Sequence, residues 1–170
     1  MKRWLTTLWH IALLRAGPQD LPAGSSSPAL ALVLYSSIVA ISRLADARAA
    51  EPADINVSIF VTIVVPLVVT ISILAARGRG ARFAQTVAAL FGTGALISLI
   101  NIPLWFSTQT PIPAPLVVLA LVGLFWSLAV DGHIWRNALD CAYAGGLIVA
   151  VVILFLQLFV FQAMGNPGVS

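Results

Sequence analysis

The sequence predicts an all-α polytopic membrane protein, in which five transmembrane helices follow an amphipathic N-terminal helix that lies in the membrane interface. Three observations predict this fold class. Hydrophobic residues make up 60% of the 170 residues and charged residues only 9%, and the mean hydropathy is +1.01. Soluble domains are about 45–50% apolar, so this chain has too little polar surface to cover one. Several apolar runs also approach the roughly 20 residues that a helix needs to cross a bilayer.

Residues 1–16 predict the interfacial helix. At helical spacing they place a weakly polar stripe on one side and apolar residues, including Trp4 and Leu8, on another. Tryptophan is enriched at the headgroup level of membranes, so Trp4 and Trp9 are candidate contacts to lipid or to a partner protein. The alternative is an ordinary N-terminal helix that packs on the other helices.

A loop, a helical bundle and a short tail are predicted after this helix. Residues 17–28 are rich in Pro, Gly and Ser, which predicts a connector with defined turns. A partner-docking loop is the alternative function for the same residues. Residues 29–165 form the bundle, and residues 166–170 form the tail. The five predicted transmembrane helices are residues 29–44, 57–76, 83–106, 116–130 and 142–164.

Basic residues predict how the chain is oriented in the membrane. Five spans divide them seven against two, whereas four spans, without residues 29–44, would divide them five against four. The cytoplasmic side normally holds the excess of Lys and Arg, which predicts five spans and a cytoplasmic N-terminus. Compactness and the use of Arg over Lys predict a bacterial inner membrane. The cytoplasmic group is Lys2, Arg3, Arg15, Arg77, Arg79, Arg82 and Arg136, and the opposite group is Arg43 and Arg48.

The segment RGRGAR carries Arg77, Arg79 and Arg82 between the second and third spans. These side chains are candidate contacts to anionic lipid headgroups or to a partner protein. A role in topology alone is the alternative, and it accounts for the same residues.

The stretch VDGHIWRNALD, residues 130–140, predicts a polar hinge between the last two spans. Asp131 and the glycine after it are typical of a turn. Arg136 and Asp140 have the spacing of a weak helical ion pair. Trp135 and Arg136 are candidate interfacial contacts to lipid or to a partner.

No catalytic, cofactor or metal site is predicted. A site built from Asp131 and His133 is the alternative, but metal sites need three or four ligands and the chain has one other histidine, His10. Cys141 is the only cysteine, and no catalytic or nucleotide-binding motif is present. The basic residues are too sparse for a nucleic-acid surface.

Small residues predict where helices approach each other closely, as they do in membrane bundles. Two sets repeat at four-residue spacing and suit internal packing or contact between two copies of the chain. They are Ala84, Ala88 and Gly92 in the third span and Ala142, Gly146 and Ala150 in the fifth. Gln157 is the deepest polar side chain and a candidate contact between helices.

Apart from Arg43, next to the last residue of the first span, no charged residue falls inside any predicted span. Intramembrane charges usually mark proton relays and ion pathways, so their absence argues against an ion pump or a proton-coupled transporter. It leaves open a carrier of lipid or of a neutral solute.

Two stretches carry a family resemblance: RFAQTVAALFGTGALISLINIPLW (residues 82–105) and LFWSLAVDGHIWRNALDCAYAGGL (residues 124–147). They hold a basic-aromatic entry into the third span, a proline at its end and a polar hinge before the last span. The matching residues are Arg82, Phe83, Pro103, Trp126, Arg136 and Ala138. In these features and its five spans the chain resembles the Yip-type family of small membrane proteins, in its bacterial branch. The resemblance implies a non-enzymatic scaffold or adaptor without catalytic residues.

Two functions are therefore expected. The first is a non-enzymatic scaffold, adaptor or accessory subunit of a membrane complex, which binds membrane lipids and either a protein partner or further copies of itself. The alternative is a small carrier or permease subunit for lipid or an apolar solute. In the carrier, a second span kinked at Pro66 and the polar Gln157 would line the path.

Overall fold

The computed structural model of the chain is all-α: every regular element among its described residues is a helix. The structure describes residues 2–22, 24, 26–45, 52–105, 107 and 112–165. In chain order the elements are α1 (Lys2–Ala12), the 3₁₀ turn η1 (Pro18–Asp20), α2 (Ser26–Ala45), α3 (Pro52–Ala76), η2 (Gly80–Arg82), α4 (Phe83–Ser98), η3 (Leu99–Asn101), α5 (Ile102–Trp105), α6 (Ala114–Leu139) and α7 (Tyr143–Gly165).

Four helical stretches are long and apolar enough to cross a membrane. Each has at least the 18 or so residues expected of a transmembrane helix. Together they indicate a multi-pass membrane protein. The apolar part of α2, Ser26–Ser42, is shorter. The four long stretches are Ile59–Ala76, Gly80–Asn101, Ala114–Leu139 and Tyr143–Met164.

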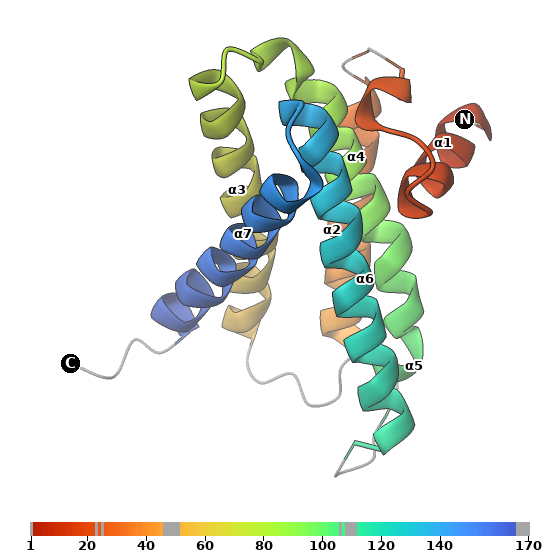
Figure 1. Ribbon diagram of the computed structural model, residues 1–170. Coiled ribbons are helices and arrows are strands. Elements are labelled where there is room, and N and C mark those ends of the chain that lie inside the picture. The colour runs from red at the N-terminus through yellow and green to blue at the C-terminus, as the bar shows by residue number, and fades with distance from the viewer. Residues whose placement is uncertain are drawn as a thin grey trace.

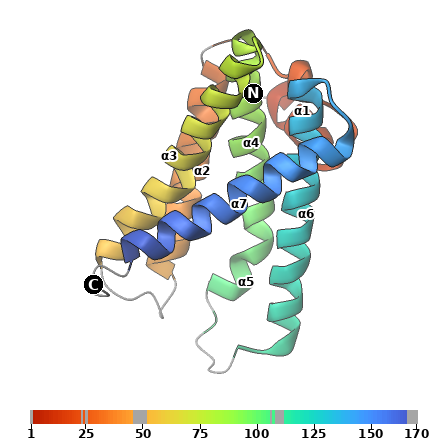
Figure 2. The same ribbon diagram turned by 60° about the vertical axis from the view of Figure 1, so that its left-hand side comes forward.

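The long helices form one bundle (Figure 1). α2 packs along α4, α4 contacts α6, and α7 contacts both α6 and α3. From its turn with α6, α7 crosses the bundle diagonally towards the far end of α3 (Figure 2). The α3–α4 connection, the α6–α7 turn and α1 all lie towards the same end, at the top of Figure 1.

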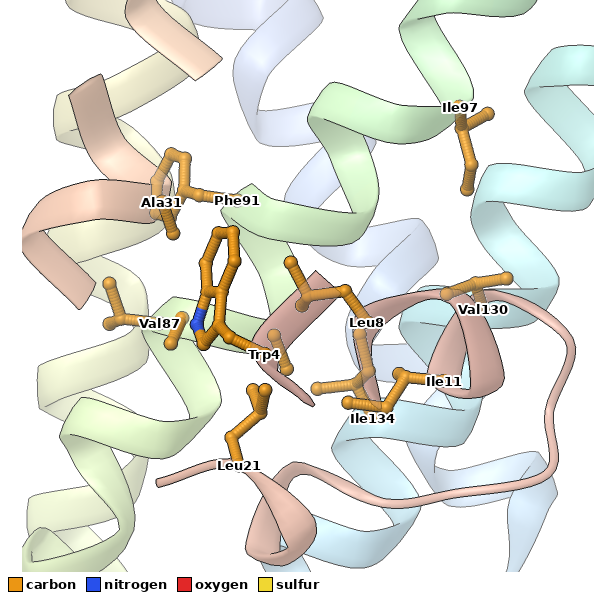
Figure 3. Close-up of a cluster of buried hydrophobic side chains, with 12 residues drawn as sticks. Trp4, Leu8, Ile11, Leu21, Ala31, Val87, Phe91, Ile97, Val130 and Ile134 are labelled. Carbon is orange, nitrogen blue, oxygen red and sulfur yellow. The ribbon is translucent and has the colours of Figure 1, made fainter. Parts of the chain in front are cut away.

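One face of α1 is part of the hydrophobic core. Trp4, Leu8 and Ile11 are buried among side chains of α4, α6 and the start of α2 (Figure 3). The indole N–H of Trp4 donates a hydrogen bond of 2.7 Å to Ser27 Oγ. Trp4 was a candidate contact to lipid or partner, and that prediction is wrong because its side chain is buried inside the chain.

The N-terminal segment is also tied to the bundle through its backbone. Its carbonyl groups after α1 have no helical partner and accept side-chain hydrogen bonds instead. The donors and acceptors are Trp126 Nε1 and Ala12 O (3.0 Å), His133 Nε2 and Ala16 O (3.0 Å), and Gln85 Nε2 and Leu21 O (3.0 Å).

Small residues let α1 approach α4. A Cβ added at Gly92 would lie 2.7 Å from both terminal methyl carbons of Leu8. Ala88, one turn earlier on α4, is fully buried in the same core cluster. The predicted small-residue face of this span is therefore internal, with Ala84 half-buried at its start.

The predicted hinge at residues 130–140 is helical. α6 continues without a break through Asp131 and Gly132 to Leu139, and the turn falls at Asp140, which has a left-handed φ of 47°. The prediction of a turn at Asp131 is wrong because Gly132 serves packing here. A Cβ added at Gly132 would lie 3.1 Å from the Cα of Leu147 in α7.

Arg82 ties the α3–α4 connection to the C-terminal end of α6. Its Nη1 donates to the carbonyls of Asn137 (2.9 Å) and Ala138 (3.1 Å), which are unpaired at a helix end. Its Nη2 lies 3.0 Å from Asp140, which also forms an ion pair with Arg79. In the described residues Asp140 pairs with these arginines and not with Arg136, as the spacing had suggested.

Candidate binding cavity

The long helices surround a partly open cavity of about 440 Å³. This volume falls in the range of about 300–1,000 Å³ that is typical of small-molecule sites. Half of the lining residues are Leu, Ile, Val or Phe, and the lining comes from α2, α3, α4, α6 and α7. The polar or ionisable side chains that line it are Tyr35, Thr62, Ser127, Asp131, Trp135 and Gln157.

The crossing of α6 and α7 positions the cavity. The two helices touch at Gly132 and Gly146, where the lack of side chains brings their backbones together. Ala150, one turn after Gly146, already lines the cavity. Because α7 then runs diagonally away from α6 (Figure 2), space remains between them, and α3 closes one side with Pro66.

Ser127, Asp131 and Trp135 recur every four residues and thus share one face of α6. All three line the cavity. Asp131 is the one carboxyl group among the described residues that line it. It forms no hydrogen bond or ion pair with any side chain or backbone group in the part of the chain that the structure describes. Tyr35 of α2 lines the same cavity.

Aromatic rings line the same cavity as this carboxyl group. Tyr35 of α2 packs edge-to-face on Phe91 of α4, with ring centroids 5.3 Å apart and an interplanar angle of 73°. Trp135 is fully buried and its Nε1 has no hydrogen-bond acceptor among the described residues. An unpaired buried N–H is costly, so a ligand or water that accepts from it would stabilise the site.

The far part of the cavity holds one amide. Gln157 of α7 is half-buried, and its Nε2 lies 3.5 Å from the carbonyl oxygen of Val61 in α3. This is the predicted contact between helices, at the long limit of hydrogen bonding. Gln157 and Val61 both line the cavity, so the contact forms part of its wall.

The predicted surface contacts divide into three groups. Trp9, Arg77 and Arg136 are exposed. Arg79 and Arg82 pair with Asp140, so their first role is within the chain. Trp135 was expected at the membrane interface, and that prediction is wrong because its side chain is fully buried and lines the cavity.

Only part of the second predicted packing set, which is Ala142, Gly146 and Ala150, lies in a helix interface. Gly146 and Ala150 are buried against α6 and the cavity, as close helix packing requires. Ala142 is exposed in the turn that precedes α7, so the structure does not bring it into this interface.

The two histidines have separate environments. His10 is exposed on α1, whereas His133 hydrogen-bonds to the carbonyl of Ala16. Among the described residues no group of three or more His, Cys, Asp or Glu side chains is placed to hold a metal ion.

A second cavity, of about 230 Å³, lies between the η1 turn, the start of α4 and the end of α6. Most of its polar lining is already engaged within the chain. Arg82 donates to α6 carbonyls, Gln85 to Leu21, and Asn137 to His133. The larger cavity is therefore the candidate site.

The sequence contains a pattern that indicates this cavity, but the prediction of a hinge at residues 130–140 hid it. If α6 is read as continuous, Ser127, Asp131 and Trp135 share one face of a helix that is apolar up to Ser127. Tyr35 has no comparable signal, because only the packing of α2 on α4 brings it to Asp131.

No family model matches this chain, and neither a curated protein nor a solved structure matches it. The resemblance to the Yip-type family stays a prediction. The function is therefore argued from the cavity.

Proposed function

We propose that the protein is a multi-pass membrane protein that binds and carries a small amphiphilic molecule in the cavity of its helical bundle. The observation that supports this is the position of Asp131, inside a candidate membrane-spanning helix and facing a mostly apolar cavity. Ionisable groups within membrane helices are rare and costly, and they mark substrate or ion pathways. The carrier was the second function expected from the sequence.

The spans had been predicted to be free of charge, which argued for a scaffold. That prediction depended on a fourth span that ended at residue 130. Because α6 continues to Leu139, Asp131 lies within a helix long and apolar enough to cross the membrane. The argument against a carrier of charged molecules therefore falls.

The N-terminal helix, with its candidate contacts to a partner protein, was the other basis for the scaffold. In the structure α1 contributes Trp4, Leu8 and Ile11 to the core, so its removal would expose the bundle. The Yip-type resemblance implies a scaffold, but no family model matches this chain. A scaffold that binds a protein partner or another copy of the chain is thus the less supported function.

We also propose that α2 is a fifth span. It is 20 residues long, or about 30 Å at 1.5 Å per residue, which matches the hydrocarbon thickness of a bilayer. It packs along α4, a candidate span. Five spans give the cytoplasmic side seven of the nine basic residues and the N-terminus. This orientation would suit a bacterial inner membrane.

In this orientation α1 lies near the cytoplasmic interface. Its outer face is suited to that position, because Trp9 is 57% exposed and Leu5 is 42% exposed beside the basic Arg3. The inner face packs on α4 and α6. We thus retain the interfacial helix as part of the proposal, attached to the bundle.

We propose binding and passage rather than catalysis. Among the described residues that line the cavity, none is His, Cys or Lys. Nucleophilic and acid–base chemistry usually pairs such a group with a second one. Asp131 therefore has the surroundings of a recognition group.

Native mass spectrometry of the protein, extracted gently from its own membrane, tests the proposal. A binding protein is expected to retain a stoichiometric small molecule, which proteoliposomes would then exchange across the membrane. A chain that retains no small molecule and instead holds a stoichiometric second protein would contradict the carrier and support the scaffold.

A further inference from the structure

We infer that the ligand of this cavity is an organic cation, with its charge beside Asp131 and its apolar groups against the aromatic lining. The inference rests on the proposed function, because it names the chemical class of the molecule that the cavity holds. Three features of the cavity support it.

The first feature is an unbalanced charge. A carboxylate that faces a mostly apolar cavity stays ionised when a cation or several hydrogen bonds compensate it, and it otherwise takes up a proton. Asp131 has neither among the residues that the structure describes. None of the described lining residues is Lys, Arg or His. The arginines whose side chains are described lie on α1, after it, or at the end shared by the α3–α4 connection and the end of α6. A cationic ligand would supply the charge that this lining lacks and would favour the ionised form of Asp131.

The second feature is the aromatic wall. Tyr35, Phe91, Trp135 and Phe161 line the cavity from four different helices, α2, α4, α6 and α7. The faces of aromatic rings attract cations, and such cages are a common way of recognising quaternary ammonium groups. A cavity lined by a carboxyl group and by aromatic rings suits a positive charge that carries apolar substituents.

The third feature is size together with the scarcity of oxygen ligands. A cavity of about 440 Å³ is far larger than an inorganic ion. Calcium and magnesium need six or more oxygen ligands, of which the protein usually supplies several. One carboxyl group in an apolar wall does not meet that need. The same wall suits an organic cation.

A phospholipid headgroup offers an ammonium group as well, but it also carries a phosphate. Phosphate recognition in proteins relies on Arg, Lys or the N-terminus of a helix. The described lining has no basic side chain, and the lining residues of α7 begin at Ala150, two turns into that helix. The cavity therefore favours a free organic cation over a zwitterionic lipid.

Equilibrium dialysis of the whole protein in a neutral detergent tests this inference. The probes are radiolabelled tetraphenylphosphonium and tetraphenylborate, which share a shape and differ in the sign of their charge. Binding to empty micelles is subtracted. The wild-type protein is expected to bind the phosphonium saturably and to bind the borate far more weakly.

Three variants locate the effect at Asp131. Asp131→Asn preserves the shape and removes the charge, and it is expected to weaken phosphonium binding by about tenfold or more. Asp131→Glu keeps the charge and is expected to retain binding. Asp140→Asn removes a carboxylate outside the cavity and is expected to bind as the wild type does. Equal binding by the wild type and Asp131→Asn would overturn the inference.

Competition separates the two sources of an ammonium group. Tetrabutylammonium is expected to displace the phosphonium, and added phosphatidylethanolamine is not. Displacement by the phospholipid alone would overturn the assignment to a free cation. Saturable binding of both probes alike would overturn the choice of a cation while the proposed function stands. The proposed function itself fails if the protein retains no small molecule and binds neither probe saturably.

Discussion

Gly146 of α7 lies against the backbone of α6, where a side chain on it would meet the carbonyl oxygen of Gly132 and the amide nitrogen of Arg136. This contact sets the crossing of the last two helices. The cavity begins one turn away from it, at Ala150. The contact between Gly132 of α6 and Gly146 of α7 thus determines where the cavity begins.

Gly146→Ala is expected to destabilise the protein. A Cβ at this position would come within 2.6 Å of the backbone nitrogen of Arg136, and backbone atoms cannot turn aside as a flexible side chain can. Overpacking of this kind costs about 1–3 kcal/mol. The melting temperature in detergent, followed by circular dichroism, measures the effect.

Gly80→Ala is the matched control, because a Cβ at Gly80 meets no atom within 4 Å. Its melting temperature is expected to stay close to that of the wild type. If both alanine variants melt alike, the close helix crossing at Gly146 is wrong.

Leu8→Ala tests whether α1 belongs to the core. Leu8 is fully buried against Gly92, and removing such a side chain usually costs about 2–5 kcal/mol of unfolding free energy. Leu5→Ala, the same change on the exposed side of α1, is expected to have much less effect. A loosely attached interfacial helix would instead give two variants of equal stability.

Asp140 provides a test by pH. Hydrogen bonds from Arg82 and then Arg79 lower the pKa of the Asp140 carboxyl from 3.8 to about 2. Because its pKa is lower in the folded protein, the carboxylate contributes stability above about pH 4 and loses it as the pH falls towards 2.

Asp140→Asn removes this contribution and keeps the turn, since Asn tolerates the left-handed φ of 47°. The variant is expected to melt slightly below the wild type at pH 7, and the difference is expected to vanish near pH 2. Salt should reduce the difference at pH 7 because the pair is exposed. A difference that persists unchanged at pH 2 would contradict this ion-pair account.

Cys141 reports the orientation of the chain. It is the only cysteine, and it lies in the α6–α7 turn with a partly exposed side chain. The proposed orientation places this turn in the cytoplasm. A membrane-impermeant maleimide is expected to label Cys141 in inside-out vesicles and to leave it unlabelled in intact spheroplasts.

The reverse pattern is expected for Ser170→Cys in a Cys141→Ser background, because the C-terminus would lie outside. Labelling of Cys141 from the outside of intact cells would reverse the orientation. Labelling of both positions from one side would contradict a membrane crossing by α7, which lies between Cys141 and the C-terminus.

Much of the fold can be predicted from local sequence. Apolar runs of membrane length indicate the helices, and α4 begins at Phe83, where the predicted third span begins after the glycines of RGRGAR. The path of α6 cannot be predicted in this way. Asp131 followed by glycine has the composition of a turn, and only the approach of Gly146 from α7 shows that Gly132 serves packing.

The candidate site depends even more on tertiary structure. Tryptophan is a residue type typical of the membrane interface, but the burial of Trp135 depends on which helices cover it. The lining of the cavity combines side chains from five helices, and their meeting depends on crossing angles that residue spacing does not encode. The sequence alone therefore predicts the bundle and not the site within it.

Filling the cavity tests the central claim most directly. Ser127→Phe places a ring inside the cavity, whereas Val122→Phe makes a similar change at a position of α6 that is 56% exposed. Native mass spectrometry of both variants, purified as the wild type is, measures the small molecule that each retains. We expect Val122→Phe to retain it in a one-to-one ratio and Ser127→Phe to lose it while remaining folded. Equal retention by the two variants would show that the molecule binds elsewhere and would contradict a carrier built around this cavity.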